Sequence, residues 1–330
     1  PDFYELKFLL ADFYEKIHKR NEARNILESI IDESGYEVES VRARSILAKY
    51  ALEDGDFVAA QKLLDMTIKE YPNNLDALFL KSKLSIMNRD AISAINSLRT
   101  VVKGDPKSAE AFLLLAQAHE LNNESALAEN ELKKSIGANP VNDETHVNYA
   151  RYLVSKGRIE DAVEVIDKAL AYFKDSVALL EVKLKILSSQ KGKDEEVLAL
   201  LNMIEQADSN NAQVNINKGK LFLAKRELEK AIEQFEQAYE KSKDKFEALS
   251  LIVKSHMINN DTDKAINILN LRLEKDQDDA MANQLLGEMY MSQKKDVDAY
   301  ARFKKASKKE PAWLKPYTSM AAVNLYKGDV

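Results

Sequence analysis

The chain has 330 residues, of which 45% are hydrophobic and 31% charged, and its formal net charge at pH 7 is −6. The acidic balance argues against nucleic acid or an anionic membrane as a partner, because both attract basic surfaces. The absence of cysteine excludes disulfides and thiolate sites, and favours a periplasmic or envelope location slightly over a cytoplasmic one. No apolar run approaches the roughly 20 residues of a transmembrane helix.

The chain repeats itself with a period of 34 residues, as the prolines Pro72, Pro106 and Pro140 show. Each period holds two amphipathic runs separated by a short turn, which predicts a pair of antiparallel helices. We therefore expect an all-α fold, a right-handed superhelical solenoid over residues 1–330. Its nine full repeats and one half repeat would be residues 4–40, 41–74, 75–108, 109–142, 143–176, 177–211, 212–245, 246–279, 280–313 and 314–330.

Three columns of residues predict how the two helices of a repeat meet. The twentieth residue is alanine in eight of nine repeats, as in Ala60 and Ala94, which indicates a close approach between helices. The twenty-fourth residue is always apolar, as in Leu64 and Leu98, and the eighth is often small. The sixth repeat fits worst, with Val197 at the alanine position and a one-residue insertion.

Turn and capping residues fall at fixed places in each repeat. Glycine or asparagine stands in mid-repeat, where a helix ends with a left-handed residue. The repeats also begin with side chains able to cap a helix N-terminus. The expected caps are Asn74, Ser108, Asn142, Ser176, Asn211 and Asp279.

This pattern resembles the tetratricopeptide repeat, most plainly in the ninth unit. The residues that carry the resemblance there are Leu286, Gly287, Tyr290, Ala299, Phe303, Ala306 and Pro311. The resemblance implies a concave groove, lined by one face of the first helices, that binds extended peptides or partner helices. The style of the units is similar to long, degenerate tetratricopeptide lipoproteins of bacterial polysaccharide-export and exosortase (PEP-CTERM) systems.

The last predicted helix, from Leu314 to Tyr326, has no partner helix after it. Since solenoids need polar ends, we expect the chain to be a fragment of a longer repeat protein. Its open C-terminal end could pair with a second copy.

No residue pattern points to catalysis. The sequence has no P-loop, GxGxxG, HExxH or GxSxG motif, and its four histidines fall in different repeats. We therefore expect a protein that is not an enzyme and that holds neither a cofactor nor a metal.

The ninth residue of each repeat forms the one distinctive column. Six of eight are basic in a chain of negative net charge: Lys49, Lys83, Arg151, Lys185, Lys220 and Lys254. The same helix face carries apolar fifth residues, and amides follow at the sixth position. These residues are Phe79, Leu113, Val147, Ile216, Asn148 and Asn217.

Two interpretations of this column stay open. It could line a groove for an acidic or extended protein segment, or the cations could pair with acidic residues of neighbouring repeats, such as Glu110, Glu144 and Glu247. The first interpretation predicts a non-catalytic protein-binding scaffold. The alternatives are a component of an envelope or exopolysaccharide assembly system, and the substrate-recruiting arm of a larger enzyme.

Overall fold

The computed structural model describes residues 3–35 and 37–327, and in this part nineteen α-helices follow one another without any strand. The predicted all-α solenoid of antiparallel helix pairs is confirmed. Residue 36 of the predicted first repeat and residues 328–330 of the predicted half repeat lie outside the described residues, as do residues 1–2.

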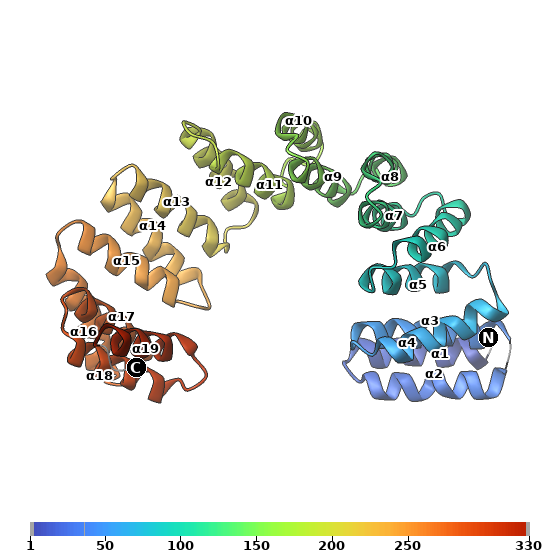
Figure 1. Cartoon of the computed structure of the whole chain (residues 1–330), viewed down its shortest axis with the longest axis horizontal. Coiled ribbons are helices and arrows are strands. Elements are labelled where there is room, and N and C mark those ends of the chain that lie inside the picture. Colours follow the sequence, from blue (N-terminus) through green and yellow to red (C-terminus); the bar gives the residue numbers. More distant parts are fainter. Residues whose placement is uncertain (1–2, 36, 328–330) are drawn as a thin grey trace. The chain divides into compact units, whose positions relative to one another are not determined.

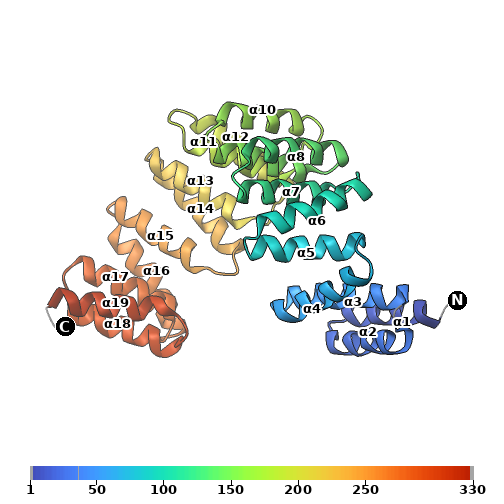
Figure 2. The same ribbon diagram turned by 45° about the vertical axis from the view of Figure 1, so that its right-hand side comes forward.

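The chain forms two compact units, residues 1–182 and 183–330, which divide inside helix α11 (Figures 1 and 2). The helices up to the boundary are α1 (Phe3–Lys16), α2 (Arg20–Ser34), α3 (Val38–Glu53), α4 (Phe57–Glu70), α5 (Leu75–Met87), α6 (Ala91–Gly104), α7 (Ala109–Leu121), α8 (Ser125–Ala138), α9 (Asp143–Ser155), α10 (Ile159–Leu170) and α11 (Val177–Ser188). Those of the second unit are α12 (Asp194–Ala207), α13 (Ala212–Ala224), α14 (Leu228–Lys241), α15 (Phe246–Ile258), α16 (Thr262–Lys275), α17 (Ala280–Ser292), α18 (Asp296–Lys309) and α19 (Leu314–Lys327). A single solenoid over the whole chain stays a prediction, and each unit is described by itself.

Within unit 1, α2, α4, α6 and α8 each pack against the odd-numbered helices before and after them in sequence, and α10 packs against α9. The first helices of successive repeats also touch: α3 contacts α5, α5 contacts α7, and α7 contacts α9. In Figure 1, α5, α7 and α9 accordingly lie on one side of the unit and α6, α8 and α10 on the other. The first helices therefore present a shared surface.

The alanine column is buried because it lies where helices approach most closely. Ala60, Ala94 and the other six alanines at this position are fully buried, and the apolar residue four positions later is buried in all nine repeats. In two repeats the eighth residue is glycine and the twenty-fourth is phenylalanine. A Cβ added at Gly219 would lie 2.3 Å from Cε1 of Phe235, and one at Gly287 would lie 2.4 Å from Cε1 of Phe303. These glycines thus make room for the larger ring.

The predicted turns and caps are present. The mid-repeat residue has a positive φ at Gly55, Asn123, Gly157 and Asn260, as expected, and also at residues that no composition rule selects. Those residues are His18, Arg89, Arg226 and Lys294. All six expected caps accept a hydrogen bond from a backbone N–H of the first turn, for example Asn74 Oδ1 from Ala77 N at 2.8 Å.

Candidate functional site

Three hollows follow one another along the first helices of unit 1. One of 440 Å³ lies between α1 and α3, one of 470 Å³ is lined by α3, α5 and α7, and one of 850 Å³ is lined mainly by α5, α7 and α9. The first two share Arg42 and Lys49, and the last two share Glu110. We call this surface the first-helix groove. Its defining residues are Arg42, Ile46, Lys49, Phe79, Lys83, Glu110, Leu113, Gln117, Glu144, Asn148 and Arg151.

The helix period explains why these residues line the groove. Residues two, five, nine and twelve of a first helix fall on one side of it, while the small eighth residue is buried toward the second helix. Packing within the repeat therefore buries the other side of the helix. The groove side is left available along the row of first helices.

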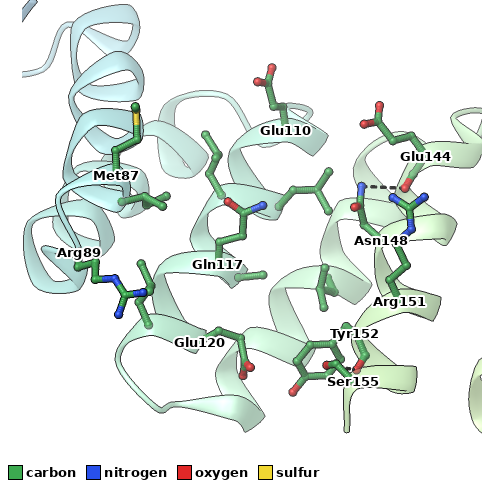
Figure 3. A pocket seen from close by; sticks show the side chains of 16 residues that line it. Met87, Arg89, Glu110, Gln117, Glu120, Glu144, Asn148, Arg151, Tyr152 and Ser155 are labelled. Carbon is green, nitrogen blue, oxygen red and sulfur yellow. Dashed lines mark hydrogen bonds between the residues drawn. The ribbon is translucent and has the colours of Figure 1, made fainter. Parts of the chain in front are cut away.

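The largest hollow combines an apolar floor with polar side chains (Figure 3). Figure 3 shows Glu110, Gln117 and Glu120 along α7 beside Asn148, Arg151 and Tyr152 along α9. The apolar part consists of Ile86, Met87, Leu113, Leu114, Ala116, Leu121 and Leu132. Such a mixture suits a ligand that offers both an apolar side chain and hydrogen-bonding groups.

Two of the three acidic residues at this hollow are neutralised by lysines. Glu110 pairs with Lys83 at 2.8 Å, and Glu120 pairs with Lys156 at 2.6 Å. The hydrogen bond to Glu120 raises the pKa of Lys156, and burial raises the pKa of the neighbouring Tyr152 phenol. Both groups are protonated at neutral pH even without these shifts, which reinforce that state.

The predicted column of cations divides into two classes. Lys83 pairs with Glu110 and Lys220 with Glu247, each at 2.8 Å, and Lys49 approaches Glu53 of its own helix at 3.9 Å. Within the described residues, by contrast, no carboxylate pairs with Arg151, Lys185 or Lys254. Arg151 lines the largest of the three hollows in unit 1, whereas Lys185 and Lys254 are exposed in unit 2.

A sequence rule accounts for the two paired examples that cross between repeats. Lys83 and Lys220 each have a glutamate 27 residues later, at the second position of the next repeat. The residues at the same position after Arg151, Lys185 and Lys254 are Ala178, Gln213 and Met281. Because none of these three is acidic, the cations before them keep their charge available.

The other predicted groove residues also differ in what they offer a ligand. Phe79 and Leu113 are half-buried and line hollows, but Val147 and Ile216 are only 2% and 4% exposed and belong to the core between helices. Asn148 donates through Nδ2 to the backbone oxygen of Glu144 at 2.9 Å. In unit 2, Asn217 Oδ1 accepts from Gln213 Nε2 at 3.1 Å.

Several residues at the largest hollow were not among the predicted groove residues. Glu120 stands at the twelfth position of its repeat, on the face that the helix period assigns to the groove. Arg89 and Tyr152 also line the hollow. Arg89 occupies the mid-repeat turn, and its φ of 60° is the conformation that glycine or asparagine adopts in other repeats.

No group of three or more histidine, cysteine, aspartate or glutamate side chains in residues 3–35 and 37–327 is placed to hold a metal ion. No helix in the same part of the chain is long and apolar enough to cross a membrane.

Comparisons with known proteins agree with this fold. Two family models, both described as tetratricopeptide repeat, match residues 88–143 and 222–289. A search of curated protein sequences found no significant match.

Several solved structures are similar to the chain. A tetratricopeptide repeat protein from Parabacteroides merdae is 16% identical, with a TM-score of 0.52 over 77% of this chain and 98% of that one. At this identity the likeness shows the fold alone. Residues 41 to the end of MamA from Desulfovibrio magneticus RS-1 are 18% identical over 53% of this chain and 98% of that one, with a TM-score of 0.46. The protein pilF from Pseudomonas aeruginosa is 17% identical over 75% of this chain and 97% of that one, with a TM-score of 0.45.

Proposed function

We propose that this chain, which matches tetratricopeptide repeat models at residues 88–143 and 222–289, is a non-catalytic scaffold that binds an extended segment of a partner protein in the first-helix groove. The observation that carries the proposal is the row of three hollows along α1 to α9. A row of hollows suits a linear ligand, whose successive side chains can enter successive hollows.

The polar groups in the largest hollow support a peptide ligand. The exposed Gln117 offers both an amide N–H and a carbonyl oxygen. The side-chain amide of Asn148 donates to Glu144, and its side-chain carbonyl oxygen can accept a hydrogen bond from a ligand. A peptide backbone presents the complementary donors and acceptors at each residue. The apolar floor around Leu113 would then bury one side chain of the ligand and supply most of the affinity.

The charges favour a ligand with an acidic group near this hollow. Arg89 and Arg151 pair with no carboxylate among the described residues, whereas Glu110 and Glu120 are already neutralised. After these pairings Glu144 is the remaining acid, so the hollow has a small basic surplus. An acidic side chain beside Arg151 would gain a charge-assisted hydrogen bond and would orient the segment.

A displayed library of short linear peptides tests this proposal. We expect the chain to select peptides with an acidic and an apolar residue, and Arg151→Glu to weaken their binding at least roughly tenfold. Lys103→Glu is the matched control, because Lys103 is exposed on α6 of the same unit. This substitution makes the same change of charge, but outside the groove. Equal binding by both variants would contradict the assignment of the groove.

The envelope-assembly role and the enzyme-recruiting role stay predictions. Both depend on other proteins or other domains, and no contact among the described residues favours either one. The scaffold function is compatible with each of them.

A further inference from the structure

The second helices α4 and α6 of unit 1 carry a basic surface, away from the row of first helices that lines the groove. Asp65 of α4 pairs with Lys81 of α5, and α6 contains no acidic residue. Glu70 of α4 pairs with Arg44 of α3. Four exposed cations on these two helices pair with no carboxylate in the described part of the chain, and we call them the basic face: Lys62, Lys69, Arg99 and Lys103.

Several other second helices neutralise their lysines within the helix or its cap. A lysine pairs with a carboxylate three or four residues away on α8, α10, α14 and α16, as Lys133 does with Glu129 and Lys168 with Glu164. Such pairs leave a helix surface neutral. The cations of the basic face lack them, so their charge is available to an anionic group outside unit 1.

Helices α14 and α16 of unit 2 carry the opposite charge. Six exposed carboxylates on these helices pair with no cation among the described residues, and we call them the acidic face: Glu229, Glu233, Glu236, Glu240, Asp263 and Glu274. Three of these glutamates line a hollow of 580 Å³ on α14, together with Gln237, Tyr239, Lys241 and Ile252. The hollow offers an acidic recess to a side chain of a partner.

The spacing of the charges allows α4 and α14 to meet as antiparallel helices. Lys62 and Lys69 stand at positions 22 and 29 of their repeat, and Glu233 and Glu240 occupy the same two positions in theirs. Both pairs therefore span about two helical turns on one side of the helix. An antiparallel arrangement places Lys62 opposite Glu240 and Lys69 opposite Glu233, and it brings α6 over α16.

We propose that copies of this chain associate with one another, the basic face of one copy meeting the acidic face of the next. Opposite charge at matching spacing attracts the two faces and fixes their orientation. Each copy carries both faces, so the interface is heterologous and association can continue beyond a dimer. Because both faces belong to second helices, the proposal does not depend on a ligand in the first-helix groove.

The dimensions of the faces predict a weak contact. Helices α4 and α6 have 14 residues each, about 21 Å in length, and neighbouring helices lie about 10 Å apart. A face of roughly 20 by 20 Å covers about 400 Å² per copy, which is typical of transient interfaces. Val58 and Ile92 beside the basic face are 82% and 66% exposed and add apolar contact. We expect a Kd on the order of 100 µM at low salt.

Sedimentation equilibrium of the whole chain over ~10–300 µM tests the proposal. At ~0.1 M salt the average mass should rise with concentration. The Kd should increase at least roughly tenfold at ~1 M salt, because the Debye length falls from about 10 to about 3 Å. Lys62→Glu/Lys69→Glu and Glu233→Lys/Glu240→Lys should each raise the Kd at least roughly tenfold. Mixing these two variants should restore association, since opposite charges again face one another.

Charge reversals on two other second helices are matched controls. Lys304→Glu/Lys308→Glu on α18 and Glu28→Lys/Asp32→Lys on α2 change exposed residues and alter the net charge by the same amounts. Neither helix belongs to a face, so neither variant should raise the Kd. Helix content measured by circular dichroism identifies any variant that fails to fold.

Carbodiimide crosslinking gives a second readout, because it joins a lysine amine to a carboxylate in direct contact. In a mixture of isotope-labelled and unlabelled chains, we expect Lys62 or Lys69 of one form to be joined to Glu233 or Glu240 of the other. A monomer at every concentration, association that survives both reversals, or a mixture that stays monomeric would overturn the proposal. A monomer that binds phosphatidylserine vesicles through Lys62 and Lys69 would also overturn it.

Discussion

Gly287 and Phe303 should be coupled energetically, because the glycine provides the space that the phenylalanine ring fills. A Cβ at position 287 would lie 2.4 Å from the ring, so Gly287→Ala forces a shift that costs about 1–3 kcal/mol as overpacking. The gain in helix propensity offsets about 1 kcal/mol of this cost. We therefore expect Gly287→Ala to lower the free energy of unfolding by up to about 2 kcal/mol.

A smaller side chain at position 303 should relieve the overpacking caused by Gly287→Ala. Phe303→Leu alone leaves a gap beside the glycine and should cost about 1–3 kcal/mol. The double variant recreates the alanine–leucine pair found at Ala48 and Leu64, which are both fully buried. We expect it to be more stable than the sum of the single changes by at least about 1 kcal/mol.

Urea unfolding followed by circular dichroism measures all four members of this cycle. Gly137→Ala is the control for helix propensity, since a Cβ at Gly137 in α8 meets nothing within 4 Å. That change should stabilise the chain slightly. Stabilisation by Gly287→Ala as well, together with simple additivity with Phe303→Leu, would refute the packing argument.

Three further predictions concern Glu205, the ion pair of Arg44 and the helix cap Asn74. In unit 2, Glu205 accepts a hydrogen bond from the buried Lys218 at 2.6 Å, and this bond lowers the pKa of the Glu205 carboxyl. The ionised carboxylate therefore adds its full contribution to the free energy of unfolding above pH 4.5. That contribution is lost as the pH falls through the lowered pKa. Glu205→Gln should cost about 2 kcal/mol at pH 7 and flatten acid unfolding below pH 4.5, whereas an unchanged acid limb would contradict the assignment. Arg44→Ala removes the partner of Glu70 at a buried site and should lower the free energy of unfolding in urea by about 3 kcal/mol. Lys83→Ala breaks an exposed pair and should lower it by less than about 0.5 kcal/mol. Equal losses would contradict this ranking. Asn74→Ala should speed hydrogen exchange of the Ala77 amide, because the lost cap stabilises the helix start by about 1 kcal/mol. Asn74→Asp keeps a capping oxygen and should leave this exchange rate unchanged.

Much of the fold follows from the sequence because each repeat solves the same local packing problem. The alanine at position 20 of the repeat and the apolar residue four positions later are buried wherever they occur, and the polar caps bond the helix starts that the proline spacing predicts. The positive φ at Arg89 or Lys294 could not be inferred from composition. There the repeat position imposes the turn on a side chain that does not favour it.

The candidate site was less predictable, because it depends on contacts between repeats. Lys83 and Arg151 occupy the same column, but the glutamate 27 residues after Lys83 neutralises it and the alanine after Arg151 cannot. Similarly, Phe79 lines a hollow whereas Val147, at the equivalent position, is buried. Helix periodicity assigns residues to a face, but the packing of neighbouring helices decides which of them remain accessible.

Photo-crosslinking from inside the first-helix groove tests the central claim most directly. A photoreactive amino acid would replace Gln117 in the largest hollow or, as the control, Lys103 on α6 of the same unit. With peptides selected from the library, the account predicts crosslinks from position 117 that Arg151→Glu abolishes, and none from position 103. Crosslinks from position 103 without any from position 117 would contradict it.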